Sequence, residues 1–139
     1  MENLIQINWL AVPVGGILSL VLGGIWYGPV AGQVWMEEMG TTEEEIRASG
    51  SPAPAMIKSF IATMVLTIGL AMVFNAANIE AGDWLGGAGF GAMLGVLVVG
   101  AATFPNYAFE DKTLRHFIIH IGYTTILMAA IGAMLAAWR

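Results

Sequence analysis

Residues 84–104, WLGGAGFGAMLGVLVVGAATF, decide the fold class of this chain. The stretch holds no charged residue, and its length matches the roughly 20 apolar residues that an α-helix needs to cross a hydrocarbon core of about 30 Å. Its apolar residues form continuous runs, whereas the strands of a membrane β-barrel alternate apolar and polar residues. In lipid such a run must satisfy its backbone hydrogen bonds within itself, so we interpret it as a transmembrane helix.

Three further stretches have the same character. Residues 9–27 contain no charge, residues 56–74 contain Lys58 near their start, and residues 114–138 carry Arg115, His116 and His120 in their opening turns. The sequence therefore predicts an all-α fold, an integral membrane bundle of four transmembrane helices in a single domain, residues 1–139. The start of the chain lacks a basic segment typical of signal peptides, so we expect the first span to stay in the mature protein.

The composition excludes several classes of protein. Of the 139 residues, 58% are hydrophobic and 11% are charged, the mean hydropathy is +0.75, and cysteine is absent. A soluble domain of this size buries only about 70% of its surface, which would leave too much apolar surface in water. The net charge of −5 and the lack of a basic stripe argue against a nucleic-acid partner. The lack of cysteine argues against a disulfide-stapled secreted module.

The basic residues are unevenly distributed between the two sides of the predicted bundle. The first and third connections with their flanking turns hold Arg47, Lys58, Lys112 and Arg115, whereas the other side holds Arg139 alone. Because positive residues favour the cytoplasm, we expect the first and third connections inside and both termini outside. Aromatic residues near the span ends fit interfacial positions, with Trp9, Trp84 and Trp138 outside and Trp26, Tyr27 and Tyr107 inside.

The first connection is long enough to hold structure of its own. Val30, Val34, Trp35 and Met39 form an amphipathic pattern that predicts a short interfacial helix ending at Gly40. Thr42 to Glu45 has the form of a capping box, so a second short helix is expected to run to about residue 49. The acidic run in it is interpreted as a solvated helix face, with a site for a cation or basic partner as the alternative.

Small residues at four-residue spacing predict where helices approach closely. The third span carries Gly87, Gly91 and Gly95, and the first carries Gly15, Ser19 and Gly23. Lipid provides no hydrophobic force between helices, so small residues favour association through van der Waals contact. The pattern fits packing within one bundle, and the ridge from Gly87 to Gly95 also fits a seam between copies of the chain.

Polar residues gather toward the predicted inner side. His116, His120 and Tyr123 share one face of the fourth span, and the topology brings Lys58, Asn106 and Glu110 to the same side. Ionisable residues in a span normally face the bundle interior and are functional candidates.

Three interpretations of this face remain open. His120 and Tyr123 could hydrogen-bond across helices to Thr63, Thr67 or a backbone carbonyl. The two histidines could bind a metal ion if a third ligand such as Glu110 or Asp111 joined them. The face could also line an ion or proton path with His120 as a titrating group. We expect no bound metal or cofactor, because two histidines without a further spaced ligand are a weak metal signature.

Short aromatic motifs resemble those of a known family. Asn8-Trp9-Leu10-Ala11-Val12 opens the first span, Gly24-Ile25-Trp26-Tyr27-Gly28-Pro29 closes it, and Trp35-Met36 follows. With His120-Ile121-Gly122-Tyr123, Gly132 and Trp138 in the fourth span, these motifs resemble a family of small bacterial four-span membrane proteins known as domain of unknown function 1761. The resemblance implies four spans and no established activity, and it singles out Trp26, Tyr27, Pro29, Trp35, His120 and Tyr123.

The functional expectation follows from what the chain holds and lacks. No serine or cysteine nucleophile stands in a recognisable catalytic motif, so we expect a protein that is not an enzyme. We expect the protein to lie in a bacterial cytoplasmic membrane, with the lipid bilayer around it. The small-residue ridges favour association with either a second copy of the chain or another membrane protein. The alternative is a small transporter or channel for protons, ions or a small solute, with a polar inner-side cavity around His120.

Overall fold

The computed structural model describes residues 6–138, and these residues form helices and connections without any strand. The first span is α1 (Ala11–Ile25) continued by the π-helical turn η2 (Trp26–Val30), and the second is α4 (Ala53–Ala76). The third consists of α5 (Trp84–Leu94), the π-helical segment η3 (Gly95–Gly100) and α6 (Ala101–Phe109), and the fourth is α7 (Leu114–Ala137). All four are long and apolar enough to cross a membrane, which confirms the all-α four-span prediction.

The first connection holds two short helices, α2 (Gly32–Met39) and α3 (Glu43–Ala48). Gly40 ends α2 in the left-handed region at φ 66°, a conformation that glycine adopts without steric cost. Thr42 begins α3 by accepting a hydrogen bond of 3.2 Å from the backbone N–H of Glu45. The short helix expected in this connection is therefore present, and the expected second one follows it.

Polar side chains and a proline begin the later spans. Pro54 lies in the first turn of α4, where its missing N–H would have no partner in any case. Asp83 caps α5 by accepting from Gly86 N–H at 2.9 Å, and Thr113 caps α7 by accepting from His116 N–H at 3.0 Å. These caps fix where the third and fourth spans enter the membrane.

Two prolines lie inside the first and third spans rather than at their ends. Pro29 lies within η2 and Pro105 within α6, so both spans run beyond the ends, residues 27 and 104, expected from the sequence. A proline removes one backbone donor, and local π-helical adjustment helps to satisfy the carbonyl that is freed. In this chain η2 contains its proline and η3 directly precedes the helix that contains the other.

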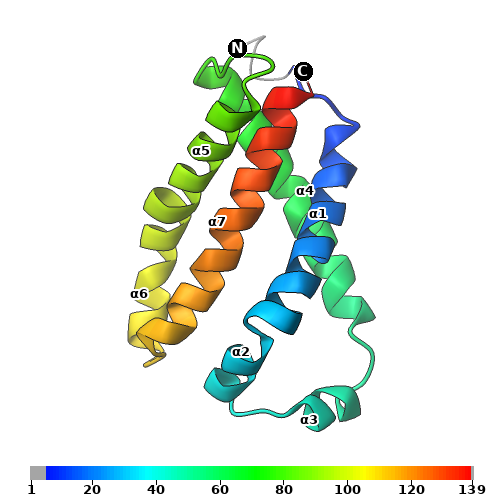
Figure 1. Cartoon of the computed structure of the whole chain (residues 1–139), viewed down its shortest axis with the longest axis vertical. Helices are drawn as coiled ribbons and strands as arrows, with labels where there is room; N and C mark the ends of the chain where they lie inside the picture. The colour runs from blue at the N-terminus through cyan, green and yellow to red at the C-terminus, as the bar shows by residue number, and fades with distance from the viewer. Residues whose placement is uncertain (1–5, 139) are drawn as a thin grey trace.

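Both ends of the described chain lie at one end of the molecule (Figure 1). The Asn8 side-chain amide donates to the carbonyl of Trp138 at 3.0 Å, and Gly82 N–H donates to the carbonyl of Ala136 at 2.8 Å. Helices α2 and α3 and the connection between α6 and α7 lie at the opposite end (Figure 1). The arrangement matches four antiparallel spans, with the first and third connections on one side.

The spans pack as two helical hairpins that α1 and α7 join. Helix α1 lies against α4, the α5–η3 segment lies against α7, and α1 contacts α7. Backbones approach closely at Gly91, where an added Cβ would collide with the carbonyl oxygen of Met128, and at Gly87, where it would collide with that of Gly132. On the other hairpin, a Cβ at Gly15 would collide with the Thr67 hydroxyl. These glycines allow the closest helix contacts in each hairpin.

The best-packed part of the bundle lies toward the end that holds both termini. Its buried side chains come mainly from the later halves of α4 and α7, and they include Leu70, Phe74, Leu127, Ile131 and Leu135. The ring of Phe74 meets that of Phe90 on α5 edge-on, with the ring centroids 5.3 Å apart. With Ala11 of α1 also buried in it, this cluster connects all four spans. At the other end the helices diverge (Figure 1).

Candidate functional site

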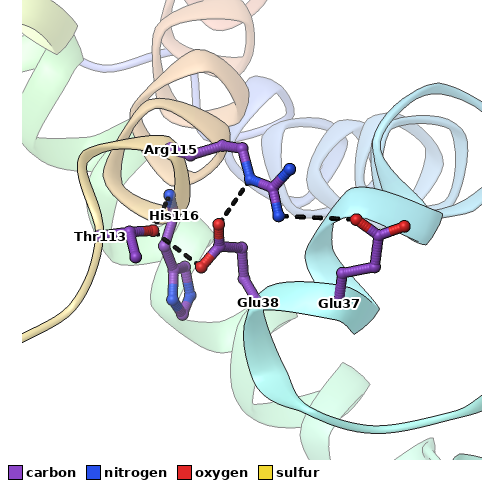
Figure 2. Close-up of polar contacts among 5 residues, drawn as sticks. All are labelled: Glu37, Glu38, Thr113, Arg115 and His116. Atoms are coloured by element: carbon purple, nitrogen blue, oxygen red, sulfur yellow. Dashed lines mark hydrogen bonds and ion pairs between the residues drawn. The ribbon is translucent and has the colours of Figure 1, made fainter.

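A set of polar contacts joins α2 to the start of α7 at the end of the molecule opposite the termini (Figure 2). The Thr113 hydroxyl that caps α7 donates to Glu38 Oε2 at 2.7 Å, and Arg115 Nε donates to Glu38 Oε1 at 2.5 Å. Arg115 also pairs with Glu37 at 3.5 Å. The Glu38 side chain is only 10% exposed, whereas that of Arg115 is 56% exposed, so the contact covers the carboxylate and leaves the guanidinium partly solvated.

The charge on Glu38 is stabilised by its two donors. The Arg115 guanidinium, followed by the Thr113 hydroxyl, holds the pKa of the Glu38 carboxyl below its usual range. A lowered carboxyl pKa means that the ionised form is favoured in the folded chain. Glu38 is therefore the polar link through which the first connection is attached to the fourth span.

Tyr107 on α6 organises the histidines of α7. Its ring stacks on that of His120 at a centroid distance of 5.8 Å and an interplanar angle of 24°. The buried His116 meets the same ring edge-on at 5.4 Å, and Lys112 Nζ lies 5.0 Å from the ring centroid. Lys112 also pairs with Glu110 at 2.8 Å, and the bond to Glu110 raises the pKa of the Lys112 ammonium. The expected histidine face therefore packs on an aromatic ring.

The sequence pointed to Tyr107 only as an interfacial aromatic residue. Its role in holding both histidines depends on the angle at which α6 meets α7, and neither residue spacing nor composition reveals that angle. The continuation of the third span through Pro105 is what brings Tyr107 beside α7.

Aromatic residues at the end of the first span attach it to α7. The Tyr123 hydroxyl donates to the carbonyl of Ser19 at 2.8 Å, and the Trp26 indole N–H donates to the carbonyl of Ile119 at 2.9 Å. The Tyr27 ring contacts both Tyr123, at 5.4 Å, and Trp35 of α2, at 5.8 Å. Of the interpretations considered for Tyr123, the observed geometry is a hydrogen bond across helices to a backbone carbonyl.

Other candidates lie outside this cluster. Lys58 and Asn106 are exposed, and no hydrogen bond or ion pair joins the side chain of either to the described residues. The lower half of α4, which carries Lys58, lies beyond α1 and away from α6 (Figure 1). Among the small residues, Gly95 lies against Thr125 of α7, Gly23 lies near the Tyr123 hydroxyl, and the hydroxyl of Ser19 donates to the carbonyl of Gly16 at 2.7 Å.

The family comparison covers nearly all of this architecture. A family model described as a protein of unknown function, DUF1761, matches residues 10–136, which include all four spans, α2 and the polar contacts at its end. The chain belongs to the DUF1761 family. No curated protein and no solved structure matches it. The DUF1761 description names no activity, so the chemistry of the site has to be argued from the residues themselves.

The DUF1761 chain holds its two histidines against one tyrosine ring, that of Tyr107. Among residues 6–138, no group of three or more His, Cys, Asp or Glu side chains is arranged to hold a metal ion. Glu110, considered from the sequence as a third ligand, pairs with Lys112 instead.

An apolar pocket of the DUF1761 chain lies beside the aromatic motif rather than at the histidines. This pocket measures about 230 Å³, and its lining includes Trp26 and Tyr123, with the indole N–H and hydroxyl bonded to carbonyls. Neither His116 nor His120 is among the residues that line this pocket. The arrangement thus fastens helices together, and Trp26, Tyr123 and Glu38 each contribute a polar contact between segments distant in sequence.

Proposed function

We propose that this protein is not an enzyme and that it acts in the bilayer by associating with a second copy of itself through the outer faces of its spans. The observation that carries the proposal is how little the four spans cover one another. In the most apolar 18-residue window of each span, only 22% to 33% of the residues are buried. Each helix therefore keeps most of its surface for lipid or for a neighbouring chain.

The outer faces combine large apolar side chains with small residues. Val65 of α4 and Leu97 of η3 are each more than 60% exposed. On the same two spans, the exposed Gly69 of α4 and Gly89 of α5 have no atom of another segment within 4 Å of the position a Cβ would occupy. Because close contact between small residues supplies much of the attraction between helices in lipid, these faces are suited to a partner helix.

The glycines for which a seam between copies was the alternative interpretation lie against the chain's own α7. Gly87 and Gly91 face α7 at distances that leave no room for a side chain. A partner has to use another surface, and α4 and the outer side of α5 are the faces that remain open.

The hydroxyl groups inside the spans support a role without catalysis. Thr63 and Thr67 of α4 and Thr124 of α7 each donate to a carbonyl one turn earlier in their own helix, at 2.9, 2.8 and 3.1 Å. A hydroxyl bonded in this way has its proton engaged by the backbone of its own helix. The stacking of Tyr107 on His120 also argues against the transport alternative, because the ring covers one face of the imidazole. Proton flux into liposomes that is lost in a His120→Ala variant would support transport instead.

We place the protein in a bacterial cytoplasmic membrane with both termini outside. Both ends of the described chain lie at one end of the molecule, and the first and third connections, which with their flanking turns hold four of the five basic residues, lie at the other; this supports the placement. Positive residues near span ends favour the cytoplasmic side.

The absence of cysteine from the chain makes disulfide crosslinking a clean test. Single-cysteine variants Gly69→Cys and Gly89→Cys place a thiol in open space on α4 and α5, whereas Ala136→Cys places it in the fully buried interior as a matched control. Oxidation in native membranes should yield disulfide-linked dimers from at least one outer-face variant and none from the control. Dimer yields no greater than the control would contradict the proposal, and a crosslink to a different protein would replace self-association with an accessory role.

A further inference from the structure

A polar pocket is lined by residues close to both ends of the described chain. These ends lie at the opposite end of the molecule from α2 and α3 (Figure 1). The pocket has a volume of about 890 Å³, and the described residues that line it are Gln6, Ile7, Asn8, Asn75, Asn78, Ile79 and Trp138. Binding pockets for small molecules commonly measure about 300–1,000 Å³, so its size suits such a ligand.

The lining is rich in carboxamides, and none of the described residues in it is charged. The side chains of Gln6 and Asn78 make no hydrogen bond with the described residues and are exposed, whereas the Asn8 amide donates to the Trp138 carbonyl. A carboxamide offers both two N–H donors and a carbonyl acceptor. Two side chains of the set thus present unused donors and acceptors to the pocket.

Part of the pocket's lining also borders the apolar core. A smaller cavity of about 30 Å³ shares Asn8, Asn75 and Trp138 with it and extends to Phe74 and Leu135 of the core. The indole of Trp138 stands at the rim, 42% exposed. The site therefore combines hydrogen-bonding amides with a partly exposed aromatic ring.

This combination discriminates between classes of ligand. None of the described lining residues offers a charged partner to an anion or a cation. A purely apolar ligand would use none of the amide donors and acceptors. Hydroxyl groups, which both donate and accept, match carboxamides, and the C–H face of a sugar ring can lie on an indole.

We infer that this pocket binds an uncharged polyhydroxylated molecule, a carbohydrate or polyol, through Gln6, Asn78 and Trp138. The inference is independent of self-association, which uses the outer faces of the spans. It predicts a binding activity at the end of the molecule that carries the termini.

The test uses the full chain purified in an amine-oxide detergent, which has no sugar headgroup. Maltose, N-acetylglucosamine and sorbitol are the neutral probes, inorganic phosphate and choline are the charged ones, and binding is measured by calorimetry. At least one neutral probe should bind saturably, and phosphate and choline should not. The absence of saturable binding by all three neutral probes, or tighter binding of a charged probe, would overturn the inference.

Two variants locate the binding to this pocket. Asn78→Asp keeps the side-chain shape, and aspartate, like asparagine, tolerates the left-handed φ of 54° at this position. Because the change removes the two side-chain N–H donors, the affinity for the neutral probe should fall about tenfold. Asn106→Asp makes the same change on exposed α6 at the far end and should leave affinity unchanged. Trp138→Phe, checked for folding by circular dichroism, should abolish the tryptophan-fluorescence change on binding. Equal affinities for the two Asp variants would place any binding elsewhere and refute the site.

Discussion

Replacing Gly91 with alanine tests the packing of the second hairpin at its tightest point. An added Cβ at this position would collide with the backbone carbonyl oxygen of Met128 on α7, and a backbone atom cannot rotate away as a side chain can. The two helices must therefore separate along their contact. Overpacking of this kind costs about 1–3 kcal/mol.

Gly89→Ala is the matched control on the same helix. No atom of another segment lies within 4 Å of the position its Cβ would occupy. This variant therefore loses backbone entropy in the unfolded chain, as Gly91→Ala does, but causes no collision in the folded one. The helix-forming advantage of alanine over glycine, about 0.5–1 kcal/mol, applies to both variants and cancels between them. The difference in unfolding free energy between the two variants should equal the collision cost of about 1–3 kcal/mol, with Gly91→Ala the less stable.

Equilibrium unfolding in mixed micelles of increasing sodium dodecyl sulfate measures this difference. The five tryptophans of the chain report the transition by fluorescence, and helix content by circular dichroism reports it independently. Equal stability of the two variants would show that α5 and α7 do not meet at this glycine, and the hairpin packing described above would be wrong.

Three further predictions concern the polar contacts and the orientation. Glu38→Gln should destabilise the chain near neutral pH, where the Glu38 carboxylate is ionised and bonded to Arg115. Because the pKa of this carboxyl is lowered in the folded chain, the stability difference between the variant and the parent chain should shrink as the pH falls below the ordinary carboxyl range. A difference in melting temperature that does not change with pH would contradict this. Tyr123→Phe should cost about 0.6–1.7 kcal/mol in the same micelle assay because it removes one interhelical hydrogen bond, and unchanged stability would argue against that bond. In right-side-out vesicles, a membrane-impermeant maleimide should label Ala81→Cys and not Ser49→Cys, both exposed; the reverse labelling would invert the topology.

Local features of the fold were predictable because their causes lie in adjacent residues. Continuous apolar runs specify the spans, Gly40 specifies the end of α2, and Thr42 specifies the start of α3. Each of these depends on hydropathy or on a hydrogen bond within a single turn. The same reasoning predicted ends for the first and third spans that are too early. Pro29 and Pro105 were read as helix ends, whereas in the structure both prolines lie inside helical segments, in or just after a π-helical stretch.

The candidate site was less predictable because it depends on how helices cross. Spacing placed His116, His120 and Tyr123 on one face, and the topology suggested that Lys58 and Glu110 would join them. The crossing of α4 over α1 instead carries Lys58 away, and Glu110 pairs with Lys112 within its own turn. Tyr107 and Glu38 enter the site from α6 and α2, at angles that no local pattern encodes.

Counting copies of the chain in a lipid bilayer tests self-association most directly. A single-cysteine variant at exposed Ser49, labelled with one fluorophore and reconstituted at high dilution in lipid, would be followed by single-molecule photobleaching. The account predicts that most spots bleach in two or more steps, at a frequency well above that of a labelled monomeric membrane protein in the same lipid. Single-step bleaching indistinguishable from that monomer would contradict it.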